Sequence, residues 1–224
     1  MPLGTLSITN QFNMKFRKLY LSLILLSIVQ FSEAQTVKDF FIPSGEINKS
    51  TFYPAGSQDK SMETVIWYKK LDDDNYRILE GKLSNGKATS IQTKIVGLKN
   101  NEVKLLKTIS TNPFTTNKEK DYSPPATYLK LPNSGNPSSW KYIDKNGATH
   151  KCTATWTKVN IEGESKKAIK VYDQYIESGS VVDFASKYKY YVEGIGLWKT
   201  QTNSEEDFEI LDSQEYDPEV DFQR

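Results

Sequence analysis

Residues 148–158, Ala-Thr-His-Lys-Cys-Thr-Ala-Thr-Trp-Thr-Lys, alternate between two kinds of side chain. The even positions carry Ala148, His150, Cys152, Ala154 and Trp156, whereas the odd positions carry threonine and lysine. Successive side chains of a β-strand point to opposite faces, so this segment is expected to be a strand with one buried and one solvent-facing side. Its register sets the prediction for the strands on either side.

The segment that follows, residues 167–176, has its apolar residues at odd positions, with Asp173 among them. A hairpin that turns at residues 162–163 pairs Trp156 with Ile169, and the apolar faces of the two strands then coincide. A loop of odd length would have placed these faces on opposite sides of the sheet. The agreement therefore supports an antiparallel hairpin in this register.

Turns on both sides extend the pattern to four strands. A turn at Ser178-Gly179 predicts that Val182, Phe184, Tyr188 and Tyr190 join the apolar face, while Lys187 and Lys189 point outward. On the other side, a three-residue loop at 145–147 with a left-handed Gly147 keeps the preceding strand in register. The aromatic residues expected on this one face are Trp140, Tyr142, Trp156, Tyr175, Phe184, Tyr188 and Tyr190.

An aromatic face of this size needs a cover. The available cover is a set of strands expected at residues 62–69, 75–83, 88–98 and 102–109, separated by turn residues. The fold class is therefore all-β and mainly antiparallel, either a sandwich or a strongly curled half-barrel. The rings are either simply core or the lining of a cup that accepts a lipid, a glycan or a peptide.

Composition excludes several classes of protein. The chain has 224 residues, 25% of them charged, with a net charge of +1, one cysteine and one histidine. Disorder, a disulfide framework and a cysteine-ligated metal are inconsistent with these values. The absence of a basic excess argues against nucleic-acid binding. No cofactor and no metal site is expected.

The first 34 residues resemble a secretory signal peptide. Lys15, Arg17 and Lys18 precede an apolar run at 19–29, and Ser32-Glu33-Ala34 supplies small residues before a cut at Gln35. A buried core helix or an uncleaved anchor are the alternatives, although the run is shorter than the roughly 20 residues of a spanning helix. We therefore expect export to the periplasm or the medium, with no membrane span after cleavage.

The remaining chain is expected to form a single domain over residues 35–211. Five of the nine prolines lie between residues 112 and 137, which predicts a crossover loop between two halves. Residues 212–224 belong to an acidic stretch and are expected to be a flexible tail.

The segment Tyr190-Tyr191-Val192-Glu193-Gly194-Ile195-Gly196-Leu197-Trp198-Lys199 resembles the closing hairpin, Y-Y-x-x-G-[IV]-G-L, of exported or lipid-anchored bacterial β-sheet proteins of unknown function, and the signal segment resembles those of Bacteroidetes. Trp198 departs from the small aliphatic residue usual there. The resemblance implies a curved sheet similar to the half-barrels of lipoprotein carriers, and an exported protein. It implies no activity.

One polar group of residues is expected on the inner face. The register places Cys152 opposite Asp173 and His150 opposite Tyr175, so the only cysteine and histidine of the chain lie beside a carboxylate. Three interpretations remain open: a Cys-His-Asp hydrolase, polar groups that orient a ligand, or plain core packing. Glu80, aligned with Ile91 and Ile95 by a turn at 85–86, is a second acid that could approach Asp173.

The sequence thus predicts an exported binding or interaction module rather than an enzyme. The alternatives are a secreted hydrolase that uses Cys152, His150 and Asp173, and a structural component of the cell envelope. The expected ligand-binding residues are Trp140, Tyr142, His150, Trp156, Asp173, Tyr175, Tyr188 and Tyr190.

Overall fold

The computed structural model describes residues 35–57, 61–112, 115–204 and 206–218, and from Thr36 onward the chain forms one compact unit. The signal-peptide prediction for residues 1–34 lies outside the described residues. The unit is almost entirely antiparallel β-sheet, which confirms the predicted fold class.

The described part of the chain contains thirteen strands and two short helices. The strands are β1 (Lys49–Pro54), β2 (Met62–Lys70), β3 (Asn75–Ser84), β4 (Lys87–Lys99), β5 (Glu102–Asn112), β6 (Thr115–Lys130), β7 (Ser138–Ile143), β8 (Thr149–Ile161), β9 (Glu164–Glu177), β10 (Ser180–Val181), β11 (Lys187–Val192), β12 (Gly196–Thr202) and β13 (Asp207–Glu215). The helices are α2 (Val37–Phe41) and the 3-10 turn η1 (Asp183–Ala185).

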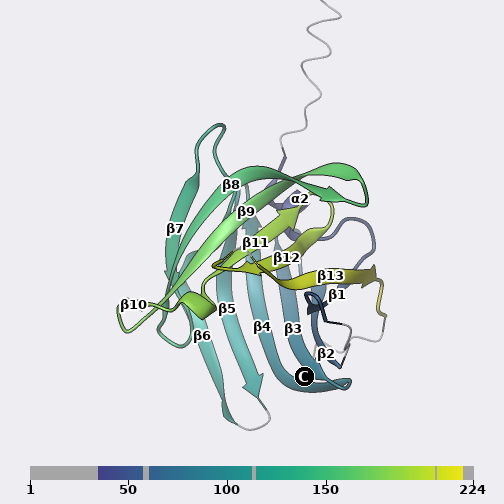
Figure 1. Ribbon diagram of the computed structural model, residues 1–224. Helices are drawn as coiled ribbons and strands as arrows, with labels where there is room; N and C mark the ends of the chain where they lie inside the picture. Colours follow the sequence, from purple (N-terminus) through teal and green to yellow (C-terminus); the bar gives the residue numbers. More distant parts are fainter. Residues whose placement is uncertain (1–34, 58–60, 113–114, 205, 219–224) are drawn as a thin grey trace, which may run out of the picture. The chain divides into compact units, whose positions relative to one another are not determined.

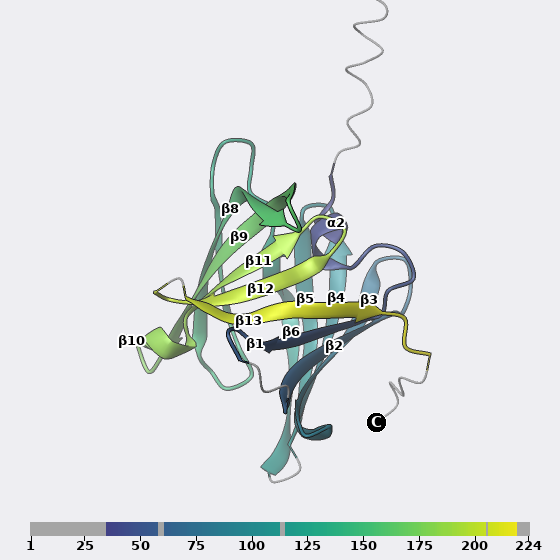
Figure 2. The ribbon, with the colours of Figure 1, turned by 45° about the vertical axis from the view of Figure 1, so that its right-hand side comes forward.

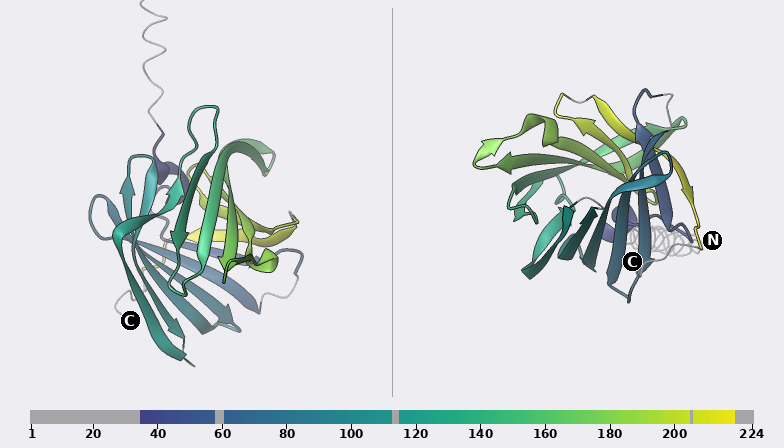
Figure 3. Two further views of the ribbon diagram at one scale, coloured as in Figure 1. Left: turned by 90° about the vertical axis from the view of Figure 1, so that its left-hand side faces the viewer. Right: turned by 90° about the horizontal axis from the view of Figure 1, so that it is seen from below.

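The strands form one continuous sheet in the order β6-β5-β4-β3-β2-β1-β13-β12-β11-β9-β8-β7, with β10 paired to β9 (Figure 1). The sheet curls until it is nearly closed, so the half-barrel alternative describes it and the two-sheet sandwich does not (Figures 2 and 3). The side chain of Lys120 on β6 reaches the end of the other edge strand, β7: its Nζ donates to the carbonyl oxygens of Ile143 and of the following residue, Asp144, both at 2.9 Å.

The predicted register of the β7-β8-β9 hairpins is confirmed. His150 pairs with Tyr175, Cys152 with Asp173, and Trp156 with Ile169. The β7–β8 connection is the expected three-residue loop, in which Gly147 has a φ of +88° and the amide of Ala148 donates to the Asp144 side chain at 2.9 Å. As expected, Trp140 then lies opposite Cys152, and Tyr142 opposite His150.

The predicted register of the next strand is wrong. The turn at 178–179 begins as expected, because β10 pairs Ser180 with Glu177. The turn η1 then interrupts the strand, and β11 resumes with Lys187 opposite Asp173, which reverses which side chains face inward. Phe184 is consequently 89% exposed.

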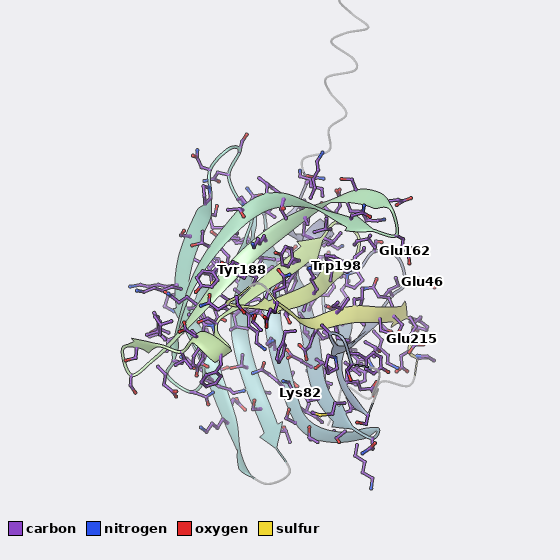
Figure 4. All side chains as sticks on the ribbon, viewed as in Figure 1. Glu46, Lys82, Glu162, Tyr188, Trp198 and Glu215 are labelled. Atoms are coloured by element: carbon purple, nitrogen blue, oxygen red, sulfur yellow. The ribbon has the colours of Figure 1, made fainter. Side chains whose placement is uncertain are left out.

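As a result, Lys187, Lys189 and Tyr191 face the interior, while Tyr188 and Tyr190 point to the outer face. On that face the Tyr188 ring lies 4.8 Å from the Tyr172 ring, and Tyr190 packs edge-on against Trp198. Tyr188 and Trp198 are labelled in Figure 4. Tyr188, Tyr190 and Trp198 form a small apolar cluster of their own with Val159, Ala168 and Val192.

The proline-rich stretch 112–137 is not a crossover loop, because most of it forms strand β6. Leu105 pairs with Ala126 and Lys107 with Asp121, so the exposed Pro124 and Pro125 fall in a bulge of β6. β6 is an edge strand, where a residue without an amide hydrogen interrupts no second ladder. Proline content therefore marked a sheet edge here rather than a loop.

The acidic segment 212–224 is likewise not a flexible tail where it is described. Residues up to Glu215 belong to β13, which pairs with β1 on one side and β12 on the other and so joins the two halves of the sheet. Beyond the strand, the Asp217 amide donates to Asn48 Oδ1 at 2.7 Å. Residues 219–224 lie outside the described residues.

Helix α2 covers one end of the curled sheet (Figure 2). No pattern in the sequence predicted this helix. Val37, Phe40 and Phe41 are buried, and the Phe40 ring lies 5.3 Å from the Trp156 ring. Gly196, in the β11–β12 hairpin, has a φ of +80°, and a Cβ there would lie 3.2 Å from the Phe41 carbonyl oxygen. This hairpin therefore needs glycine in order to approach α2 closely.

Candidate functional site

The inner face of the sheet becomes more polar with distance from α2. Along β3 the inward side chains are Tyr76, Ile78, Glu80 and Lys82 in order from the α2 end; along β4 they are Val96, Lys94 and Gln92, and along β11 Tyr191, Lys189 and Lys187. The residues nearest α2 are buried hydrophobics. The opposite end, which carries the β3–β4 and β7–β8 turns, is termed the open end.

A cavity of about 380 Å³ follows this gradient. Apolar walls line its inner part, including Phe41 of α2, Ile78, Leu105 and Tyr191. At the open end it reaches the surface beside Asn146, which is exposed. The cavity thus has an apolar interior and a polar opening.

Two ion pairs line the cavity between these zones. Lys94 Nζ lies 2.8 Å from Glu80 Oε2, and Lys189 Nζ lies 2.6 Å from Asp173 Oδ2. The ring of Tyr128 is shared by both ammonium groups, at 5.3 Å from Lys94 Nζ and 5.9 Å from Lys189 Nζ. The two ion pairs therefore form one compact charged layer across the interior, with one residue each from β3, β4, β9 and β11.

The lysines keep both carboxylates ionised. The charge of Lys94 lowers the pKa of Glu80 to about 2, against the opposing effect of burial. Burial would raise the pKa of Asp173, but the charge of Lys189 and the hydrogen bond from His150 hold it well below its usual range. Neither acid is thus poised to donate a proton near neutral pH, which argues against a glycosidase pair.

Asp173 also joins the predicted cysteine and histidine. His150 Nδ1 lies 2.7 Å from Asp173 Oδ1, and Cys152 Sγ donates to the same oxygen at 3.6 Å. The His150 ring stacks on Tyr142 with centroids 4.4 Å apart, and Tyr175 meets it edge-on at 5.1 Å. The structure therefore brings the trio together as expected.

The order within the trio does not suit nucleophilic catalysis. The carboxylate of Asp173 lies between the thiol and the imidazole, so the thiol of Cys152 contacts a negative charge and not the imidazole of His150, which would have to accept its proton. Burial, followed by the charge of Asp173, raises the pKa of the Cys152 thiol far above its usual value. A thiol held protonated is a poor nucleophile, and Cys152 does not line the cavity.

The predicted ligand-binding residues divide into three groups. Tyr142, His150, Asp173 and Tyr175 line the cavity. Trp140 and Trp156 lie on the inner face, paired across from Cys152 and Ile169, but outside the cavity lining. Tyr188 and Tyr190 lie on the outer face, so their assignment to the concave surface is wrong, because η1 shifts the register of β11.

Several residues that line the cavity were not predicted from the sequence, among them Lys94, Tyr128 and Lys189. Lys94 faces inward because a bulge between Lys82 and Leu83 shifts the β3–β4 register, and the same bulge turns Ile91 and Ile95 away from Glu80. The sequence held a partial signal for Lys189, because Lys187, Lys189 and Tyr191 alternate along β11 and so lie on the same face. No pattern in the sequence predicts the bulge in the β3–β4 pairing.

The described residues hold no cluster of histidine, cysteine and acidic side chains suited to a metal ion. Within the same residues, no helix has both the length and the apolar character needed to cross a membrane. Comparison of the chain with protein-family models, curated proteins and solved structures finds no match.

Proposed function

We propose that this chain is an exported, non-catalytic binding protein that holds a small ligand inside its curled sheet. The observation that carries the proposal is the cavity of about 380 Å³, whose walls change from apolar near α2 to charged at the open end. Ligand pockets commonly have roughly 300–1,000 Å³ and combine apolar walls with a few convergent polar groups. The signal-like sequence at residues 1–34 supports the exported location.

The polar groups are suited to orientation rather than chemistry. His150 is fixed between Tyr142 and Tyr175 and bonded to Asp173, and Asp173 is neutralised by Lys189. Such mutually satisfied groups present fixed hydrogen-bonding atoms to a ligand without an activated nucleophile. A binding role therefore fits the cavity better than hydrolysis.

Fluorescence titration with N-phenyl-1-naphthylamine, an uncharged probe that brightens in apolar surroundings, tests the proposal. We expect saturable binding at one probe per chain. Gln92→Trp places a large ring at a cavity-lining position of β4 and should abolish binding, whereas Thr93→Trp, on the opposite face of the same strand, should leave it intact. Absence of saturable binding, or equal binding by both variants, would refute a cavity site.

A further inference from the structure

The open end of the cavity carries three lysines from three separate parts of the fold. Lys82 comes from β3, Lys145 from the β7–β8 turn and Lys187 from β11, and all three line the cavity. Lys94 and Lys189, deeper inside, each have a carboxylate partner. Among the described residues, none of the three outer lysines has a carboxylate at ion-pair distance.

The acids at this end are already engaged. Asp144 Oδ1 accepts hydrogen bonds from the amides of Asn146 and Ala148, at 2.8 and 2.9 Å. Glu209 Oε1 accepts the hydroxyl of Thr64 at 2.7 Å. The opening therefore presents ammonium groups that no described carboxylate pairs at short distance, although Lys187 Nζ lies 3.5 Å from the centre of the Phe208 ring.

Burial disfavours the charged form of two of these lysines, Lys145 and Lys187. Burial lowers the pKa of Lys187, and the charges of Lys82 and Lys189 lower it further against the opposing effect of Glu209. Burial also lowers the pKa of Lys145, whose ammonium group donates to Ser110 Oγ. An anion placed among these lysines would compensate their buried charge and reduce their mutual repulsion.

The hydroxyl group of Thr200 lies farther from the opening than these lysines and has no hydrogen-bond partner among the described residues. Thr200, on β12, is paired across from Lys189 on one side and Glu209 on the other, and it lines the cavity. The residue is 6% exposed, and its Oγ1 is buried. Buried polar atoms are normally satisfied, so a ligand atom or water at this position is expected.

Beyond this layer the walls offer only apolar and aromatic surface on the side toward α2. Ile78, Leu105 and Tyr191 line the cavity there and are buried, and Phe41 of α2 lines its inner part. A hydrocarbon chain gains free energy by transfer from water into such surroundings, and a charged group does not. A ligand that matches both ends is therefore amphiphilic, with its polar group at the lysines.

We propose that the cavity binds a single-chain amphiphile whose anionic head, a carboxylate or a phosphate, lies between Lys82 and Lys187 while its hydrocarbon chain extends toward Phe41. This inference rests on the binding function proposed above and specifies the class of ligand. Thr200 then donates its hydroxyl to the head group or to the first polar atom beneath it.

Displacement of bound N-phenyl-1-naphthylamine by chain-matched amphiphiles tests the inference. The competitors are dodecanoate, dodecyl phosphate, 1-dodecanol and dodecyltrimethylammonium, each kept below the concentration at which it forms micelles or precipitates. We expect at least one of the two anions to displace the probe at a concentration about tenfold lower than the cation, as charge-assisted hydrogen bonds provide. Comparing the two anions distinguishes a carboxylate head from a phosphate head.

Charge variants locate the head group. In Lys82→Gln/Lys187→Gln the preference for the anion over the cation should fall about tenfold. Lys170→Gln/Lys199→Gln removes the same charge from the outer face of β9 and β12 and should keep the preference. Saturable binding of the probe by Lys82→Gln/Lys187→Gln shows that the double variant is folded, so that a lost preference reflects the missing charges.

The outcomes separate the two proposals. If the probe binds but all four amphiphiles displace it equally, the anionic head is refuted and the cavity site stands. If the preference survives in Lys82→Gln/Lys187→Gln, or is lost equally in the outer-face variant, the head does not lie at these lysines. If the probe itself does not bind, the proposed function fails and the inference with it.

Discussion

Lys189 Nζ lies 2.6 Å from Asp173 Oδ2, and this pair connects β11 to β9 inside the curled sheet. Asp173 is 6% exposed and shares its other oxygen with His150 and Cys152. The carboxylate is thus the centre of the buried polar group, and Lys189 is the residue that neutralises it.

Removal of this lysine should destabilise the protein strongly. Lys189→Met leaves Asp173 buried without a counter-charge, which costs about 3–5 kcal/mol of unfolding free energy. Adding Asp173→Asn to the variant should restore most of that loss, because the buried charge is then gone. Urea unfolding at pH 7 measures both effects. Equal stability of Lys189→Met and Lys170→Met, a lysine of the outer face, would contradict the inward register of β11.

The lowered pKa of Glu80 should make the stability of the protein depend on pH. Its pKa in the folded protein is about 2, below the value of about 4.3 in an unfolded chain. The resulting stabilisation is complete above the unfolded pKa and is lost as the pH falls through the folded one. The difference in unfolding free energy between wild type and Glu80→Gln should therefore shrink between pH 5 and about pH 2. Urea unfolding of both proteins across this pH range measures the difference. Glu46→Gln, at an exposed position, is the control. A difference that stays constant with pH would contradict the Glu80–Lys94 ion pair.

Cys152 should react slowly in the folded protein. It is 3% exposed, and burial raises its pKa, so little thiolate is available to an alkylating reagent. Iodoacetamide labelling followed by mass spectrometry should be rapid only after unfolding in urea. Cys152→Ala should leave probe binding unchanged, because the residue lies outside the cavity lining. Fast native labelling would revive the thiol hydrolase.

Two phenylalanines should differ sharply in their contribution to stability. Phe40 of α2 is fully buried against Trp156, so Phe40→Ala should cost about 3–5 kcal/mol. Phe184 is 89% exposed in η1, so Phe184→Ala should change the free energy of unfolding by less than about 0.5 kcal/mol. Thermal or urea unfolding compares them directly. A large loss for Phe184→Ala would restore the register that the turn at 178–179 implies.

The sequence predicts those parts of the fold in which one local rule decides the result. Alternation in β8 and the turn at 162–163 are enough to place His150, Cys152 and Asp173 on one face. The glycine in the 145–147 loop is enough to bring Tyr142 against His150. Four of the eight expected ligand residues accordingly line the cavity.

The predictions are wrong where an irregularity of one to three residues reverses which side chains of a strand face the interior. The turn η1 exchanges Tyr188 for Lys189 at the interior, and the bulge after Lys82 places Lys94 beside Glu80. Such irregularities are set by packing against distant strands, which local pattern does not contain. Acidic content was misleading for a related reason, since β13 pairs with β1, which lies far away in the chain. Proline content was misleading for a different reason: β6 pairs with the preceding strand β5, and its other edge has no strand partner in the described part of the chain, so prolines are tolerated there.

The pairing of β1 with β13 imposes an order on folding. β1 is the first strand after α2, and it pairs with β13, the last described strand. Most of the chain must therefore be synthesised before the β1–β13 ladder can form. Until then β1 lacks one of its two hydrogen-bonded neighbours, and the N-terminal and C-terminal halves have no shared ladder. Contacts between such distant segments are entropically slow to make. A chain stalled or cleaved before residue 207 would therefore present two unsatisfied edges, one on each half, and be prone to associate with other copies through them.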